Sequence, residues 1–372
     1  MKIEVYSPTI RRKEMDAVLT ALVEDKIGPG EHAQNLIQIA KDRLHFDYAL
    51  ALRSPAIALS IALRTLNLET GQGVIISALS PRYYKQVIED LGLVPLYADV
   101  LPSQASIGPE TIEALRSLPD MPTARCIVLD HTLGYMPDMA AILNVGLPVI
   151  EDRSRSYGTL AAERPLGPAA AAEAAAAEAA AVAGADVKPA PEAPYPAGVL
   201  SILGLEEKDL LTAGGGALLY AMNRRDAAVL RNYATLPPEY GLPDMNAAMA
   251  VVQFREAARN LEKRKEIAKV YAQSSLRTRH KRFVQNDTFE YNNYAFSLVL
   301  ETGMKDVVAY AKKKDIAVLS ALEDTLVGAG LVPVELCPEA YSLSLRTALF
   351  PLYPRLSGPE IEKVGKLILT LP

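Results

Sequence analysis

The chain has 372 residues, half of them apolar and 6% aromatic, with no Trp. This length is enough for two domains, or for one large and one small domain. The formal net charge of −5 at pH 7 argues against nucleic acids and anionic membranes as partners. No apolar run approaches the roughly 18 residues of a membrane span, and the start of the chain lacks the apolar stretch of a signal peptide. We therefore expect a cytoplasmic protein.

The two cysteines, Cys126 and Cys337, are far apart and lie among apolar residues or beside a proline. Disulfide frameworks and metal sites are recognised in sequences by cysteines at characteristic spacings. We therefore expect neither a disulfide nor a metal site, and we expect both cysteines to be packing residues.

The first part of the chain alternates helical and strand-like segments. From residue 16 to about residue 63 the apolar spacing is helical, with an interruption at residues 28–30. The expected strands that follow cover residues 73–79, 94–100, 124–130 and 147–152, and the expected helices cover residues 83–92, 109–118 and 136–146. Continuously apolar strands are typical of a parallel sheet covered on both faces. The sequence therefore predicts a doubly wound α/β domain that binds ligands at the carboxyl ends of its strands, where Asp152 lies.

Residues 169–197 differ in composition from the rest. They begin with a run that is almost entirely Ala and Glu, and they end in a Pro-rich stretch. The first part favours a helix with little to bury, and the second favours an extended spacer. We interpret the segment as a surface insertion. The alternative is a docking arm for a partner subunit.

The last third of the chain predicts a smaller unit. A long helix is expected over residues 245–272, followed by strands at 294–300 and 316–319 and helices at 305–315 and 358–369. Short segments of both types indicate a compact α+β domain. We expect a large α/β domain over residues 1–245, and the long helix with a small C-terminal α+β domain over residues 246–372.

Six short motifs, in this order, resemble those of the DegT/StrS-type sugar aminotransferases. They are IGPGEHAQNL (27–36), DHTLGYMPDMAAI (130–142), VIEDRSRSYG (149–158), KDLLTAGGGAL (208–218), EKRKEIAKVY (262–271) and RTALFPLYPRLSGPEIEKV (346–364). The similarity covers nearly the whole chain apart from residues 169–197. The resemblance implies fold type I of the pyridoxal-phosphate (PLP)-dependent transferases, with a mostly parallel large sheet, and a homodimer whose active-site mouths lie at the subunit interface.

The resemblance also assigns roles in PLP chemistry. This chemistry needs an amine that bonds to the cofactor's aldehyde and a carboxylate that keeps the pyridine nitrogen protonated. By the resemblance, Lys208 is the amine, which also moves the substrate's Cα proton, and Asp152 is the carboxylate. The alternative for Lys208 is a solvated lysine in a charged run. His131 is assigned to the site, and a buried, hydrogen-bonded structural histidine is its alternative.

The segment that corresponds to the family's phosphate-binding loop departs from the pattern. Family members bind the phosphate with an "S-N-G-T-A-A-L" segment at a helix N-terminus. Here residues 53–59 read RSPAIAL, in which Pro55 has no N–H and Ala56 has no hydroxyl. Ser54 and the backbone amide of Ala56 remain as expected phosphate contacts.

Further expected cofactor contacts also differ from the family. Arg155 occupies a place where Gln or His is usual, and Ser201 lies two residues upstream of the place of the family's phosphate-binding Ser. No aromatic residue aligns with the one that stacks on the ring, so Tyr83 or Tyr84 is the expected replacement. Residues 241–245 lack the Asn that the partner subunit contributes in the family.

We therefore expect a PLP-dependent aminotransferase that moves an amino group from an amino acid, glutamate by the resemblance, to a keto-sugar, which in the family is usually nucleotide-linked. No residue in the sequence identifies the donor or the acceptor. The alternative is a degenerate, non-catalytic homologue that serves as a binding or partner subunit. The retained Lys208 and Asp152 favour the enzyme, whereas Pro55 and the missing Asn favour the alternative. A dehydrogenase is disfavoured because no G-x-G-x-x-G follows the first strand.

Overall fold

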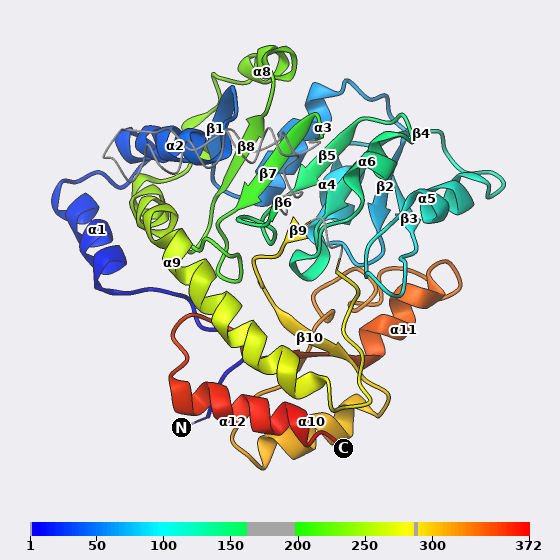
Figure 1. Ribbon diagram of the computed structural model, residues 1–372. Helices are drawn as coiled ribbons and strands as arrows, with labels where there is room; N and C mark the ends of the chain where they lie inside the picture. The colour runs from blue at the N-terminus through cyan, green and yellow to red at the C-terminus, as the bar shows by residue number, and fades with distance from the viewer. Residues whose placement is uncertain (1, 162–197, 286–288) are drawn as a thin grey trace, which may run out of the picture.

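The computed structural model describes residues 2–161, 198–285 and 289–372. Its largest element is a seven-stranded sheet (Figure 1). In spatial order the strands are β1 (Tyr48–Leu52), β8 (Ala217–Ala221), β7 (Leu200–Gly204), β5 (Val149–Asp152), β4 (Ala124–Asp130), β2 (Gly73–Ser77) and β3 (Val94–Ala98). Strand β8 is antiparallel to both of its neighbours, and the five strands from β7 to β3 are parallel. The expected mostly parallel α/β sheet is therefore confirmed.

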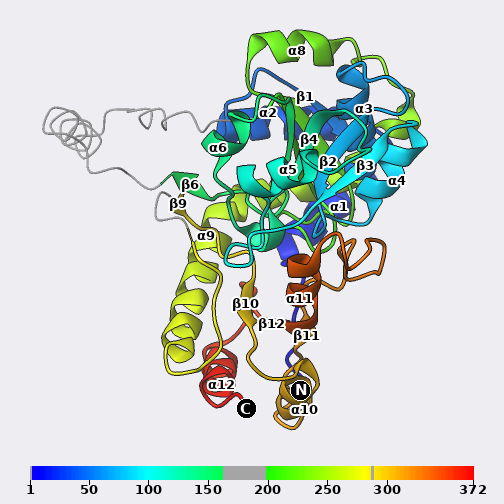
Figure 2. The same ribbon diagram turned by 90° about the vertical axis from the view of Figure 1, so that its right-hand side faces the viewer.

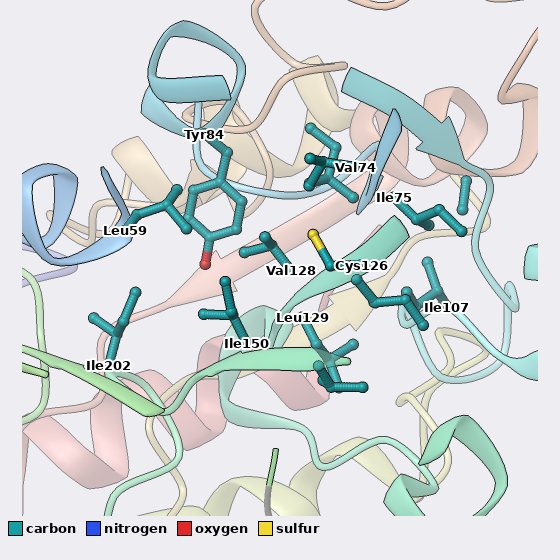
Figure 3. Close-up of a cluster of buried hydrophobic side chains, with 14 of the residues drawn as sticks. Leu59, Val74, Ile75, Tyr84, Ile107, Cys126, Val128, Leu129, Ile150 and Ile202 are labelled. Atoms are coloured by element: carbon teal, nitrogen blue, oxygen red, sulfur yellow. The ribbon is translucent and has the colours of Figure 1, made fainter. Parts of the chain in front are cut away.

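Both faces of this sheet are covered by helices, as its continuously apolar strands require. One face packs against α3 (Pro55–Thr65) and α4 (Tyr83–Asp90), whereas α5 (Pro109–Arg116) lies on the opposite face (Figure 2). Figure 3 shows this core, in which Leu59 and Tyr84 from the helices lie beside the strand residues Val128 and Ile150. The other face packs against α2 (Glu31–Leu44) and the first part of α9 (Asp244–Ser275). Shorter elements near the sheet are α1 (Arg12–Val23), α6 (Met139–Leu143), α8 (Arg224–Arg231), β6 (Leu160–Ala161) and β9 (Phe289–Glu290).

The last part of the chain builds a second sheet with its own apolar core. This antiparallel sheet has the order β10 (Phe296–Val299), β12 (Thr347–Phe350) and β11 (Leu319–Ser320). It packs with α10 (Met304–Lys312), α12 (Gly358–Leu369) and the second part of α9, while α11 (Pro338–Arg346) leads into β12. Figures 1 and 2 both place α10 and α12 at the end of the molecule away from α8. Helix α9 has 32 residues, roughly 48 Å at the usual rise, and connects the two cores.

Among the described residues, six strands were not expected: β1, β6, β7, β8, β9 and β12. The helical spacing predicted for residues 16–63 holds for α1, α2 and α3, and its break at residues 28–30 separates α1 from α2. The helical prediction is wrong at β1, because residues 48–52 form a short apolar run that periodicity alone does not assign to helix or strand. His45 ends α2 in the left-handed conformation, with a φ of 55°, and thereby redirects the chain into β1.

Other expected elements are shorter than predicted. Of the helix expected at residues 136–146, only α6 is helical. Asp138 caps its N-terminus, because its carboxylate accepts a hydrogen bond from the backbone N–H of Ala141 at 3.0 Å. Cys126 and Cys337 are both buried and free, as expected for packing residues. The predicted insertion at 169–197 lies outside the described residues. Within the described part of the chain, no helix combines the length and apolar character needed to cross a membrane.

Candidate active site

A cavity of about 470 Å³ lies at the carboxyl ends of β4 and β5. Asp130 is the last residue of β4 and Asp152 is the last residue of β5. The other walls of the cavity come from the start of α3, the loop before α4, the segment after β7 and the C-terminal part of the chain. The lining residues are Pro55, Pro81, Arg82, Tyr83, Asp130, His131, Asp152, Ser154, Arg155, Glu206, Glu207, Lys208, Asp209 and Asp324. This is the edge at which a doubly wound sheet binds its ligands.

The buried Asp152 carboxylate accepts hydrogen bonds on both of its oxygens. Oδ1 accepts from the backbone N–H of Ser154 at 3.0 Å and from the Ser154 hydroxyl. Oδ2 accepts from the hydroxyl of Tyr84 at 2.8 Å and from that of Tyr83 at 3.2 Å. Burial, together with the negative charge of Asp152, raises the pKa of each tyrosine well above its ordinary value. Both phenols are therefore protonated donors at neutral pH.

Lys208 lies in the segment that follows β7, and its side chain is half exposed. The Nζ of Lys208 is 2.7 Å from Oδ2 of Asp324, whose other oxygen is 3.5 Å from Nη2 of Arg82. The hydrogen bond from Lys208 lowers the pKa of Asp324, and the charges of Lys208 and Arg82 act in the same direction. The backbone carbonyl of Lys208 accepts a hydrogen bond from the Tyr294 hydroxyl at 2.8 Å. The lysine is thus held by residues from two distant parts of the chain.

Asp209 adds a further carboxyl group next to Asp152. Burial raises the pKa of Asp209 to about 7, and the negative charge of Asp152 contributes in the same direction. The backbone N–H of Glu206 donates to Oδ2 of Asp209 at 2.9 Å, which only partly opposes the shift. The cavity therefore holds one carboxyl group that changes its charge near neutral pH.

Arg155 supplies positive charge to the same cavity. Its guanidinium carbon lies 5.8 Å from the centroid of the Tyr294 ring. Burial disfavours the charge, but the electrostatic influence of Tyr294, Asp209 and Asp130 outweighs burial and raises the pKa of Arg155. The backbone carbonyl of Arg155 accepts from Nδ2 of Asn292 at 2.7 Å, which fixes the loop after β5.

His131 lines the cavity, but its ring nitrogens are engaged with buried groups. Nδ1 is 2.5 Å from the Ser156 hydroxyl, and Nε2 is 3.2 Å from Oε1 of Glu151. Burial works against the charge of Glu151, yet His131 and the nearby Arg153 lower the pKa of this carboxyl group. These contacts agree with a structural histidine, and a contact between His131 and a ligand stays a prediction.

Three of the described residues expected to bind the cofactor, Ser54, Ala56 and Ser201, do not line the cavity, and their contacts with the cofactor stay predictions. The Ser54 hydroxyl accepts a hydrogen bond from the Ile57 N–H at 3.3 Å and so caps the N-terminus of α3, whose first two residues are Pro55 and Ala56. Ser201 is fully buried near the start of β7, on the face opposite to Asp152. Ser54, Ala56 and Ser201 are not among the described residues that line the cavity. For Ser201 the reason is its place in the strand, because the cavity lies at the other end of β7.

The residues present can be compared with the needs of PLP. Lys208 offers an amine and Asp152 a carboxylate on the walls of one cavity. For the phosphate, the same walls offer the guanidinium groups of Arg82 and Arg155, whereas Pro55 contributes no backbone donor. The donor set therefore fits PLP at its aldehyde and at its ring nitrogen, and it differs from the family's backbone cradle at the phosphate.

Sequence reasoning missed Arg82, Asp209 and Asp324. Asp209 had a signal in the sequence, because it directly follows Lys208. Asp324 had none, because it is 116 residues from Lys208 and belongs to no motif. Only the packing of the C-terminal part against the large sheet brings it to the cavity.

The fold is similar to those of several solved structures. The PLP form of Spr1654 from Streptococcus pneumoniae is 16% identical with a TM-score of 0.81, over 100% of this chain and 98% of that one. The aminotransferase TlmJ from Streptoalloteichus hindustanus is 17% identical with a TM-score of 0.79, over 98% and 97%. The sugar aminotransferase CalS13 from Micromonospora echinospora is 15% identical with a TM-score of 0.78, over 99% of each chain. The fold is thus that of the type I PLP-dependent transferases.

The family is shown by the sequence match. Residues 8–177 and 221–369 match the model of the DegT/DnrJ/EryC1/StrS aminotransferase family, which is well over half of the chain. The match covers strands β1 to β5 of the large sheet and the C-terminal part, and it leaves out residues 178–220, which include β7 and Lys208. The chain therefore belongs to the DegT/DnrJ/EryC1/StrS family of aminotransferases, which use pyridoxal phosphate.

Proposed function

We propose that this chain transfers an amino group from an amino acid, with glutamate as the expected donor, to a keto-sugar. The family supports aminotransfer as the reaction class. One observation carries the proposal for this chain: Lys208 and Asp152 line the same cavity at the carboxyl ends of the parallel strands. A nucleotide-linked form of the sugar is implied by the resemblance alone and stays a prediction.

In this proposal, Asp152 binds the ring nitrogen of the cofactor and Lys208 bonds to its aldehyde. When bound, PLP supplies an electron sink for the carbanion at the donor's Cα. The Asp152 carboxylate favours the protonated form of the ring nitrogen, because an opposite charge nearby stabilises a cation. Once the donor's amine has displaced it from the aldehyde, Lys208 would take up the proton from the donor's Cα and deliver it to the cofactor's aldehyde carbon. In the second half-reaction it would move a proton from that carbon to the acceptor carbon.

Lys208 needs an unprotonated amine for this work, so its ion pair with Asp324 has to be exchangeable. The two side chains are 51% and 56% exposed. Exposed ion pairs contribute only about 0–1 kcal/mol. The contact therefore orients Lys208, and breaking it when the amine reacts costs little free energy.

At the phosphate end, Arg82 and Arg155 are the proposed charge partners. Each hydrogen bond lost to a charged phosphate costs about 1.5–3 kcal/mol, so the missing donors at Pro55 and Ala56 predict weaker PLP binding than a complete cradle gives. Arginine pairs well with phosphate oxygens and offsets part of this loss. The proposed site is thus held by side-chain charge more than by backbone amides.

A homodimer is also part of the proposal. Helix α1 packs against α9 but leaves an apolar stripe on its outer side, formed by Met15, Leu19, Leu22 and Val23. These four side chains are each between 46% and 76% exposed and follow the i, i+4, i+7, i+8 spacing of one helix face. An exposed stripe of this kind favours contact with another protein surface, and a second copy of this chain is the occupant that the family implies.

The reaction class is tested by a single half-reaction. Protein loaded with PLP is mixed with glutamate and no acceptor, and 2-oxoglutarate is measured. The proposal expects about one equivalent per active site from the wild type, because each site transfers an amino group only once without an acceptor. Lys313→Ala, a change at an exposed lysine remote from the cavity, should behave as the wild type, and Lys208→Ala should release none. The proposal is contradicted if the loaded wild type releases no 2-oxoglutarate from glutamate and no keto acid from any other natural amino acid.

A further inference from the structure

The Asp152 carboxylate has no acceptor position left for a ligand in this arrangement. An ionised carboxylate offers about four lone-pair sites. Ser154 supplies two donors to Oδ1, and the hydroxyl groups of Tyr83 and Tyr84 supply two to Oδ2. A ring nitrogen that donates to Asp152 therefore has to replace one of these four donors.

Three of the four donors are fixed. The Ser154 backbone N–H belongs to the chain just after β5, and the Ser154 hydroxyl also accepts from the Gly204 N–H at 2.7 Å. Turning this hydroxyl away would leave a buried N–H without its partner, which is costly. Tyr84 is fully buried in the apolar core between α4 and the sheet, which Figure 3 shows. Its ring has no room to leave without opening that core.

Tyr83 is different in each of these respects. It lines the cavity and is only partly buried, and its contact of 3.2 Å is the longer of the two tyrosine contacts. Tyr83 is also the first residue of α4, so no earlier turn of the helix restricts its side chain. Its phenol remains a protonated donor at neutral pH because burial raises its pKa.

We propose that the Tyr83 hydroxyl is an exchangeable ligand of Asp152, which occupies the cavity-facing lone pair of the carboxylate until the ring nitrogen of PLP takes its place. The inference rests on the proposed function, because it assumes that Asp152 binds this nitrogen. The internal hydrogen bond satisfies a buried carboxylate in the cofactor-free protein, and it competes with the cofactor. Tyr83 is therefore a positioning residue that sets the affinity for PLP and not only a wall of the cavity.

The test compares two tyrosine variants of the full-length protein, freed of cofactor. Tyr83→Phe removes the competing donor and keeps the ring, and Tyr84→Phe is the matched change at the fixed donor. Affinities are measured for PLP and for its analogue with carbon in place of the ring nitrogen, by titration followed in the absorbance spectrum. The thermal midpoint Tm of the cofactor-free forms shows that each variant folds.

Tyr83→Phe is expected to tighten PLP binding by about tenfold, since a hydrogen bond to a charged acceptor no longer has to be broken. The affinity for the carbon analogue is expected to stay unchanged, because that analogue does not donate to Asp152. Tyr84→Phe is expected not to tighten PLP binding, since Tyr84 is not displaced. An affinity of Tyr83→Phe for PLP equal to or below that of the wild type overturns the inference, as does an equal gain for the carbon analogue.

Failure of the inference is distinguishable from failure of the proposed function. If the wild type and Tyr83→Phe bind PLP equally and both bond to it through Lys208, only the inference fails. If neither protein binds PLP, both fail. If Tyr83→Phe binds PLP and the wild type does not, the inference is supported in its strongest form.

Discussion

The amine of Lys208 lies 2.7 Å from the carboxylate of Asp324, although 116 residues separate them in the sequence. The segment that carries Asp324 is bound to the turn directly after β2 by two backbone hydrogen bonds. Leu326 donates to the carbonyl of Ser80 at 3.0 Å, and Val327 donates to that of Ala78 at 3.1 Å. The C-terminal part therefore contributes a charged residue to a cavity that is otherwise built at the edge of the large sheet.

Replacement of Asp324 by Asn should make Lys208 more reactive in the cofactor-free protein. The Asp324 carboxylate accepts a hydrogen bond from the Lys208 amine at 2.7 Å, so its loss frees the amine to meet an outside reagent. Because the pair is exposed, an increase of about two- to fivefold in the labelling rate is expected. The rate is measured with an amine reagent and mass spectrometry at neutral pH. Lys313 in the same samples is the internal reference, and an unchanged or lower rate at Lys208 contradicts the prediction.

Asp209 predicts a pH dependence of stability. Its pKa is raised to about 7 in the folded protein, from an ordinary value near 3.8, so the folded state binds the extra proton between these values. Stability is then greatest toward the acid end of this window and is lost as the pH rises to 7. Asp209→Asn removes this loss, so between pH 5 and pH 8 the variant should lose less free energy of unfolding than the wild type, by on the order of 2 kcal/mol.

The measurement is urea unfolding of both proteins at pH 5 and pH 8. Asp25→Asn, a change at an exposed residue remote from the cavity, is the control and should follow the wild type at both pH values. The prediction is wrong if Asp209→Asn and the wild type differ by the same free energy of unfolding at pH 5 and at pH 8.

The apolar stripe on α1 predicts the oligomeric state. We expect a homodimer at micromolar concentration, with more than roughly 2,000 Å² buried between the subunits, as is usual for obligate interfaces. Leu19→Glu places a charge in the middle of the stripe and should weaken the dimer by at least about tenfold, because a buried unpaired charge is costly. Light scattering measures the mass of both proteins. Val229→Glu on α8 is the control, and a monomeric wild type contradicts the expectation.

The insertion at residues 169–197 is expected to be dispensable for folding. Its first part has almost no side chain larger than Ala to bury, and its Pro-rich end resists sheet pairing. Replacement by a short Gly/Ser linker should change Tm by no more than a few degrees, as for loops without packed side chains, and should leave the oligomeric state unchanged. A large fall in Tm, or loss of the dimer, would show that the segment packs as a structural element.

Four strands of the large sheet were predictable because each can be recognised from its own short stretch of sequence. Strands β2, β3, β4 and β5 are largely apolar runs bounded by turn residues, and the sequence alone places Asp152 at a strand end. Strand β1 was missed because five apolar residues between two helices have no decisive period. Long elements with repeated periodicity, such as α9, were predicted nearly to their ends.

The site was predictable only where its residues belong to motifs. Lys208 and Asp152 were identified in this way, and they line one cavity. A motif does not specify the direction of a side chain, so the hydrogen bonds of Tyr83 and Tyr84 to Asp152 could not be anticipated. Ser201 matched a motif only approximately, and its place within β7 puts it on the other face of the sheet. We retain the division of the chain after residue 245 as a proposal.

The most direct test is to identify the lysine to which PLP bonds. Cofactor-free protein is mixed with PLP, reduced with borohydride to fix the bond, digested and analysed by mass spectrometry. The account predicts a visible absorbance band before reduction and a pyridoxyl label on Lys208. The label should be absent from Lys208→Ala and weaker in Asp152→Asn. No band at saturating PLP, or a label on another lysine, would contradict the central claim that this chain carries out PLP chemistry through Lys208.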